Sequence, residues 1–343
     1  MGLFYRPILK GREGEFDALG QAAERTWKST MPLLELVPTT ARGSSGGARR
    51  ACQDFRDRLR DTMRLGMRIA VDTAAVPADG TLVHGGGVLL DLLTEISAMA
   101  EVVPVVRLDD PAAVDDVVRA GAEHGVLVRV RPDQLGTDEL GDLLRRLAAE
   151  ADVQKSRVDL VVDFGPVGSR TARAAVSDAV VRVLDDDGWR SRTVAGGAFP
   201  RDLASVQPWE LTEIPRHEVS LWSRLRREIG AGLDFGDYAV AHPLPSGRGS
   251  APPPQLRYAV QDRWLVIKGD RHRPQQFFEV CRRIRSHPEF TGQLGSADRS
   301  IAGRAENGPA GGQGAGTGST WRALSTAHHL DFVVDHGTTH GEP

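Results

Sequence analysis

The sequence predicts a single (β/α)8 barrel of the TIM type, an α/β fold, and three observations support this prediction. Short apolar runs alternate with amphipathic helical segments along most of the 343 residues, a pattern typical of a parallel sheet covered by helices. Eight such runs occur, and eight units favour closure into a barrel over an open sheet. No GxGxxG follows the first run, which further disfavours an open dinucleotide-binding sheet.

The eight expected strands are mostly rich in Val, Ile and Leu, as strands buried on both faces should be. They span residues 5–10, 32–37, 68–73, 102–107, 126–131, 158–164, 192–198 and 234–241. Helical patterns between them span residues 13–26, 49–65, 88–99, 112–124, 138–151, 170–186 and 208–229. Pro215 should break the last of these helices into two pieces.

The rest of the chain predicts three further parts. A β-hairpin at about 255–269 is inserted after the eighth strand, and a helix over 274–285 then closes a barrel domain of residues 1–290. Residues 291–320 are rich in Gly and form a flexible linker. Residues 321–343 regain apolar character, so we expect this tail to pack back on the barrel.

Composition excludes several classes of protein. The net charge of −3 gives no general electrostatic reason to expect nucleic acid. The two cysteines, Cys52 and Cys281, lie in helical patterns without CxxC spacing, which predicts buried reduced thiols. The first residues show no secretory-leader pattern, so none is expected, and no apolar run of about 18 residues occurs in the sequence. We therefore expect a cytoplasmic protein without a membrane partner.

Charged residues recur at the carboxyl ends of the expected strands, where barrel enzymes carry their active sites. These residues are Lys10, Glu35, Asp72, Arg107, Arg129, Arg131, Asp163 and Asp237, while strand seven instead ends in Gly196-Gly197. Burying charge is costly unless it is paired or binds a ligand. Two interpretations follow, namely an ion-pair network that plugs the barrel mouth or a pocket for a polar ligand, and we favour the pocket.

The residue types in this ring suggest roles. The arginines at 107, 129 and 131 could hold a phosphate or carboxylate through their planar forks. Candidate catalytic residues for proton transfer are Lys10, Glu35, Asp72, Asp163 and Asp237. Carboxylates of this number also suit Mg²⁺ or Mn²⁺, but the neighbouring arginines would neutralise them. A divalent cation is therefore an alternative that we do not favour, and we assign no metal ligand.

Two segments outside the ring are further candidates. Lys268, Arg271 and Arg273 precede a helix and could bind an anion, although a basic solvated loop is an equal alternative. Trp321, Arg322, His328 and His329 could close over the pocket as a lid, and docking of the tail for stability is the favoured alternative. Zinc is disfavoured because HEXXH and cysteine ligands are absent. His84, in the loop after the third strand, is a weak catalytic candidate.

Several short segments of the chain resemble the beta family of proteins from bacteria and phages. They are Tyr5-x-Pro7-Ile8-Leu9-Lys10-x-x-x-Gly14-Glu15 with Pro32-Leu33-Leu34-Glu35-Leu36, then Phe235-Gly236-Asp237-Tyr238, and finally Trp321-Arg322 with His328-His329. The resemblance covers essentially the whole chain. It implies one unified fold and a phage-linked or mobile-element context, and it adds Tyr238 to the candidate ligand-binding residues, but it supplies no mechanism.

Two hypotheses of function follow. The first is a barrel that binds, and in an enzyme also converts, a small anionic molecule such as a nucleotide or a phosphorylated metabolite. The second is a non-catalytic component of a phage or defence assembly that binds protein or nucleic acid. Its motivation is the resemblance together with two basic segments, residues 56–64 and 271–285. Nucleic acid is not favoured, because such runs are more often solvated helix faces.

Overall fold

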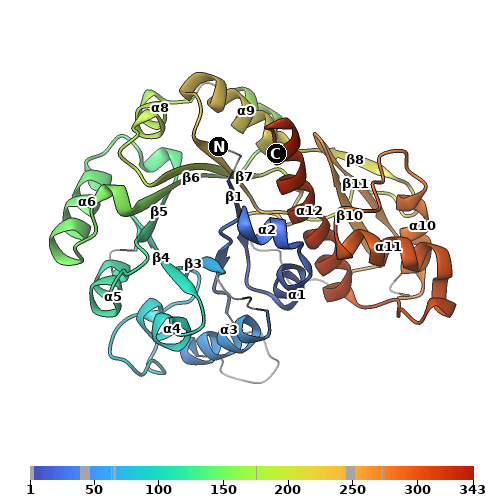
Figure 1. Cartoon of the computed structure of the whole chain (residues 1–343), viewed down its shortest axis with the longest axis horizontal. Coiled ribbons are helices and arrows are strands. Elements are labelled where there is room, and N and C mark those ends of the chain that lie inside the picture. The colour runs from blue at the N-terminus through green and yellow to red at the C-terminus, as the bar shows by residue number, and fades with distance from the viewer. Residues whose placement is uncertain are drawn as a thin grey trace.

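The computed structural model describes residues 4–38, 47–62, 64, 67–110, 112–174, 176–244, 252–271 and 273–343. Eight parallel strands close into a barrel (Figure 1), which confirms the predicted fold class. In order around the barrel they are β1 (Tyr5–Leu9), β2 (Leu33–Glu35), β3 (Arg68–Asp72), β4 (Glu101–Arg107), β5 (Val126–Val130), β6 (Val158–Pro166), β7 (Ser191–Gly197) and β9 (Leu233–Asp237). β9 pairs with β1 and closes the ring.

Alternation of side chains along each strand produces two separate cores. Ile8, Ala70, Val105 and Val161, all expected to point inward, belong to the small core inside the barrel. The opposite face of the strands packs against the surrounding helices in a much larger core. The polar side chains that follow the inward-facing apolar residues therefore point toward the barrel axis.

Helices surround the barrel on the outside (Figure 1). They are α1 (Glu13–Gln21), α2 (Glu24–Lys28), α3 (Ala48–Thr62), α4 (Val88–Ile96), α5 (Ala112–Ala120), α6 (Glu139–Glu150), α7 (Ser169–Arg173), α8 (Asp178–Asp185) and α9 (His217–Ile229), with 3-10 turns at Pro132–Gln134 and Lys155–Arg157. In α3 the buried positions, including Cys52, Phe55 and Leu59, recur at helical spacing. Such a stripe anchors an amphipathic helix to the core.

A second, antiparallel sheet lies beside the barrel. It contains β10 (Gln255–Val260) and β11 (Arg263–Lys268), the hairpin expected at 255–269, and β8 (Thr212–Pro215) in the order β10-β11-β8. β8 replaces the first part of the helix expected over 208–229. Thr212 and Ile214 are β-branched and pair with Val266 and Trp264, and Pro215 ends the strand at the free edge, where it costs no ladder hydrogen bond.

The closing helix of the barrel differs from the expected one. The segment expected to close the barrel forms α10 (Gln276–Arg285), which instead covers the small sheet together with α11 (Ser296–Asn307). The 3-10 turn Gly308–Gly311 follows, and then α12 (Gly318–His340) packs between the barrel and the small sheet (Figure 1). α12 is therefore the eighth helix of the barrel and not a separate tail.

The region expected to be a linker also contains regular structure. Within residues 291–320, α11 buries Ala297 and Ile301 in the core that it shares with the small sheet. Both cysteine thiols are free and buried, as expected, and burial raises the pKa of each to about 12. Within the described ranges, no helix has the combined length and apolar character that a membrane span requires.

Candidate functional site

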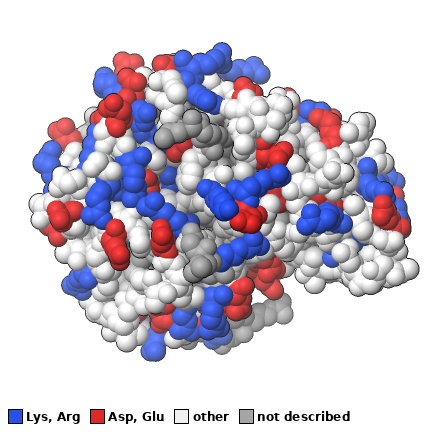
Figure 2. Space-filling view, in the orientation of Figure 1, with Lys and Arg blue, Asp and Glu red and all other residues white. Residues whose placement is uncertain are grey.

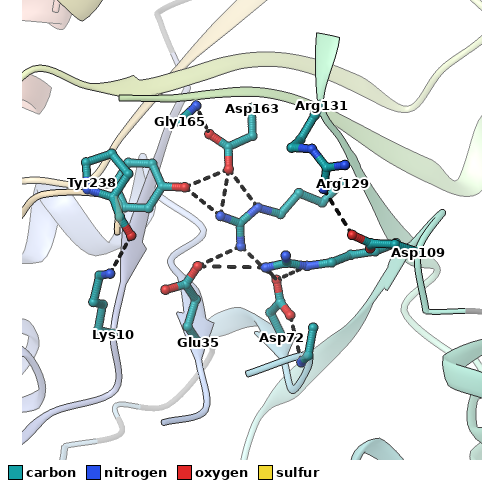
Figure 3. Close-up of polar contacts among 12 residues, drawn as sticks. Lys10, Glu35, Asp72, Asp109, Arg129, Arg131, Asp163, Gly165 and Tyr238 are labelled. Atoms are coloured by element: carbon teal, nitrogen blue, oxygen red, sulfur yellow. Dashed lines mark hydrogen bonds and ion pairs between the residues drawn. The ribbon is translucent and has the colours of Figure 1, made fainter. Parts of the chain in front are cut away.

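Arg129, on β5, lies at the centre of the barrel mouth. Its Nη1 donates to Glu35 Oε1 at 2.8 Å and to Asp72 Oδ2 at 2.7 Å. Its Nε and Nη2 donate to Asp163 Oδ2 at 3.0 and 2.7 Å, and Nη2 also reaches the Tyr238 hydroxyl at 2.6 Å. Figure 3 shows these four side chains converging on one guanidinium. Every nitrogen of Arg129 is thus committed to the protein, which leaves it no free edge for a ligand.

Arg107, one strand away on β4, is bonded on one edge only. Its Nε and Nη2 donate to Asp72 Oδ2 at 2.9 and 2.6 Å, and Nη2 lies 3.8 Å from Glu35 Oε1. Within the described part of the chain, its Nη1 has no hydrogen-bond partner. The side chain is 26% exposed, against 6% for Arg129. Arg107 is therefore the ring cation that can still bind an anion.

The glycines at the end of β7 explain why that strand contributes no charged residue to the mouth. A Cβ on Gly197 would lie 2.9 Å from the Pro243 ring and 3.2 Å from the Tyr238 ring. Tyr238 fills this space and donates its hydroxyl hydrogen to Asp163 Oδ2 at 2.6 Å. The small residues of strand seven thus make room for a polar side chain that the chain segment after β9 supplies.

Lys10 and Glu35 lie on the side of the ring that β1 and β2 form. Lys10 follows β1, and its Nζ donates to the Pro243 carbonyl. Burial lowers the Lys10 pKa, and the nearby Glu35 carboxylate opposes this. Only Oε1 of Glu35 accepts a hydrogen bond from the described residues. The free carboxylate oxygen and a lysine of lowered pKa are the kind of groups that proton transfer requires.

Apart from the half-exposed Arg131, which pairs with Asp109 and Asp133, the ring residues at the mouth comprise equal numbers of cations and carboxylates. They are Lys10, Arg107 and Arg129 against Glu35, Asp72 and Asp163. Burial alone would raise the pKa of Asp72, but Arg129 and Arg107 hold it below its usual range. Burial and the Asp163 charge raise the pKa of Tyr238 well above its usual range. Asp72 therefore stays ionised and Tyr238 stays a neutral donor, so both serve the network.

Two cavities adjoin the ring, so the charged side chains do not fill the mouth. The larger, of about 450 Å³, is lined by ring residues and by the segments after β5 and β6. The second, of about 400 Å³, lies against the segments after β3 and β4 and the first turns of α4 and α5. Arg107 and Asp109 line both cavities. Arg131 lines the larger one, where its half-exposed side chain pairs with Asp109 and Asp133.

Asp237 was expected to belong to the charged ring, but it lies outside it. It lies on the same face of β9 as Leu233 and Phe235, whose side chains pack in the outer core. Its carboxylate accepts from the Tyr5 hydroxyl at 2.5 Å and from His329 Nε2 at 2.7 Å. Because side chains alternate between the two faces of β9, Asp237 points away from the mouth, and the next residue, Tyr238, points inward.

A buried polar network surrounds Asp237, and sequence reasoning missed two of its members. Arg216 Nη2 lies 3.7 Å from Asp237 Oδ2, and Arg216 Nε donates to Glu218 Oε1 at 3.3 Å. Neither is visible as a motif, because Arg216 and Glu218 lie at the start of α9 and meet Asp237 only through folding. Trp264 Nε1 donates to His329 Nδ1 at 3.4 Å. Because indole only donates, the His329 proton lies on Nε2 and points at Asp237.

The residues expected to form a lid are instead part of α12. His328 and His329 are each at most 1% exposed, and Trp321 is equally buried in the core around the small sheet. His328 contacts Asp298 Oδ1 at 2.7 Å and the Ala259 carbonyl at 2.9 Å. Because they lie inside a long packed helix, these side chains join the barrel to the small sheet and do not gate the mouth.

The basic segment before α10 does not reach the mouth either. Lys268 Nζ donates to the Leu203 carbonyl at 2.7 Å, while Arg271 and Arg273 are exposed. His84 is exposed and lines neither cavity of the mouth. Among the described residues, no group of three or more His, Cys, Asp or Glu side chains is arranged to hold a metal ion. The ring carboxylates converge on Arg129 instead.

The network around Asp237 gives a pH prediction for Glu218→Gln. Burial raises the Glu218 pKa to about 7, with Arg216 opposing this and Asp237 adding to it. Folded protein therefore binds more protons than unfolded protein between about pH 4.5 and 7. We expect the stability of the variant relative to wild type to improve by roughly 3 kcal/mol as the pH rises through this interval.

Urea unfolding of both proteins at pH 5, 6, 7 and 8 measures this difference. The substituted amide can still accept from the Ala198 N–H, as Glu218 Oε2 does. Glu213→Gln, at a half-exposed position of β8, is the control. Its free energy of unfolding should differ from that of wild type by the same amount at every pH. A Glu218→Gln difference that does not change with pH would contradict the prediction.

The fold and the mouth together define a (β/α)8 barrel protein with a self-neutralised charged ring and two adjoining cavities. A family model described as Beta protein matches residues 5–335. The chain therefore belongs to the Beta protein family, which confirms the resemblance seen in the sequence. A search of curated proteins found no match, and neither did a search of solved structures.

Proposed function

We propose that this barrel binds a small molecule carrying a phosphate or carboxylate group, such as a nucleotide, at the carboxyl-terminal mouth of its strands. The observation that supports this most directly is Arg107, which lines both cavities and whose Nη1 has no hydrogen-bond partner among the described residues. An anionic group bonded to Nη1 would receive a charge-assisted hydrogen bond. The half-exposed Arg131 lies on the wall of the larger cavity and supplies a second cation.

The carboxylates of the mouth suit the remaining polar groups of such a ligand. In the part of the chain that the structure describes, one Glu35 oxygen accepts no hydrogen bond, and Asp109 lines both cavities. These acceptors fit ligand hydroxyl or amino groups, which a nucleotide or sugar phosphate carries together with its anion. If the ligand reacts, Lys10 and Glu35 are the pair we assign to proton transfer. Asp72 and Asp163, which accept hydrogen bonds from Arg129, then position the ring.

The geometry of the two basic segments gives less support to the alternative of nucleic acid. Near the start of the first segment, Arg56 pairs with Asp57 and Glu95. In the second, Arg282 and Arg283 pair with Glu279. Figure 2 shows basic and acidic side chains interspersed over the face in view. Mixed charge weakens the long-range attraction that a phosphate backbone requires. Binding of a protein partner stays a prediction. A pull-down with this chain as bait, repeated at low and high salt, would test it.

A ligand screen with the Arg107→Gln variant tests the proposal. Adenosine monophosphate, ribose 5-phosphate and citrate are added to wild type in a thermal-unfolding assay at low salt. We expect at least one to raise the Tm by a few degrees at saturating concentration. Loss of a charge-assisted hydrogen bond should weaken its affinity about 10-fold or more in Arg107→Gln.

The control is Arg271→Gln, which removes the same charge from an exposed loop outside the mouth. Each variant is compared with its own unliganded Tm, because Arg107→Gln also removes a partner of Asp72. The proposal fails if no anion stabilises the wild type, or if Arg107→Gln responds to the ligand as Arg271→Gln does.

A further inference from the structure

Two arginines outside the mouth line a small cavity together. The cavity, of about 30 Å³, is lined by the first turns of α12, by the start of β10 and by Val240. Arg257 reaches it from β10 and Arg322 from α12. Its volume suits a terminal group of a few heavy atoms and not a whole metabolite.

Among the residues that the structure describes, neither arginine forms a salt bridge. Arg257 donates to the Val240 carbonyl and to Gln255 Oε1 at 3.2 Å, and its guanidinium lies 4.3 Å from the Phe199 ring centroid. All of these partners are neutral. Within the described residues, neither Arg257 nor Arg322 has a carboxylate oxygen within 4.0 Å. This distinguishes the pair from Arg107 and Arg129 at the mouth, which both form salt bridges with carboxylates.

The two positive charges also act on each other. Burial, and then the charge of Arg322, lower the Arg257 pKa to about 9. Burial likewise lowers the Arg322 pKa, and the more distant Glu15 only partly opposes this. Since buried cations are costly without a counter-charge, a bound anion would relieve the repulsion between them.

The start of α12 adds donors to the same cavity. The Thr317 N–H already donates to Thr320 Oγ1 at 3.1 Å, whereas the N–H of Gly318 lies in the first turn, where no intrahelical acceptor exists. Gly318 lines the cavity, and a Cβ there would meet only the Pro252 ring at 3.9 Å. The helix dipole also favours negative charge at this end.

We propose that Arg257, Arg322 and the first turn of α12 form a binding site for a small oxyanion, a phosphate or a carboxylate group, separate from the barrel mouth. The arginines supply the charge, and the amide of Gly318 and the Gln255 Nε2 supply neutral donors. Because Gln255 Oε1 accepts from Arg257, its amide nitrogen is oriented by the arginine that the anion would contact.

Isothermal titration of inorganic phosphate, and in a parallel arm acetate, tests this site. We use Arg107→Gln as the background, so that any binding at the mouth is suppressed. We expect saturable binding of one anion per chain, weakened about 10-fold or more by Arg322→Gln and unchanged by Arg271→Gln. A tighter response to acetate than to phosphate would assign a carboxylate source to the same site.

Arg257→Lys provides a second variant, because it keeps the charge but loses the planar fork, and it should also weaken binding. The proposal is overturned if the Arg107→Gln protein binds neither anion, or if Arg322→Gln and Arg257→Lys bind as tightly as their background. Binding that occurs in wild type and disappears in Arg107→Gln would belong to the mouth. That result would support the proposed function and overturn this inference.

Discussion

Replacing Arg129 with methionine is expected to lower the free energy of unfolding by about 3–5 kcal/mol. The substitution removes the cation to which Glu35, Asp72 and Asp163 all bond, and leaves these carboxylates close together in the barrel mouth. Arg107 can compensate only Asp72 and Glu35. Chemical denaturation at pH 7 measures the loss, with the m-value showing whether unfolding stays two-state.

Arg131→Gln is a matched control, because it removes an arginine from the same end of β5. That side chain is 52% exposed and pairs with Asp109 and Asp133 at the surface, so we expect a change of about 0–1 kcal/mol. An equal loss in the two variants would contradict the central role that the geometry gives to Arg129.

The pH dependence of the Arg129→Met loss has a definite sign. In wild type the Asp72 pKa is below its usual range, so its contribution to stability is present above about pH 4 and is lost on acidification. Without Arg129 the folded carboxylates should have raised pKa values, so the variant gains stability as the pH falls from 7 toward 4.5. The difference in free energy of unfolding between variant and wild type should therefore become smaller at low pH. A difference that does not change with pH would argue against repulsion among the carboxylates as its cause.

Much of the barrel and most of its ring could be predicted because both depend on a local period. Strand residues alternate between two faces, and parallel strands end at one common opening. Ile8 and Lys10, or Leu127 and Arg129, show this two-residue period directly. Asp237 was misplaced because it lies one residue from the inward position. β9 has an acidic residue on each face, Asp234 on one and Asp237 on the other, so polarity alone does not show which face points inward.

The parts that could not be predicted depend on contacts between distant segments. α12 packs against the barrel on one side and the small sheet on the other, so Trp321–Val334 lacks the polar face that marks an amphipathic helix. β8 is short and ends in Pro215, and it becomes a strand only by pairing with β11. Arg216 meets Asp237 over 20 residues away, and no spacing rule connects the two.

Replacing Asp237 with alanine should cost about 3–5 kcal/mol. Its carboxylate accepts hydrogen bonds from Tyr5, His329 and the Ala239 N–H at 2.5–2.9 Å, and all three donors would be left buried without an acceptor. Asp335→Ala is the control on α12, where a partly exposed carboxylate pairs with Arg25 and should contribute about 0–1 kcal/mol. Urea unfolding of both variants at pH 7 gives the comparison.

The double variant Asp237→Ala/Glu218→Gln separates the loss of hydrogen bonds from the loss of charge balance. Arg216 lies between the two carboxylates, and removal of Asp237 also removes one cause of the raised Glu218 pKa. Glu218 can then ionise and neutralise Arg216 alone. When both are removed, a fully buried cation has no counter-charge, so the combined loss should exceed the sum of the single losses by about 1–3 kcal/mol. Strictly additive losses would mean that the hydrogen bonds of Asp237, and not its charge, stabilise the contact between the barrel and α12.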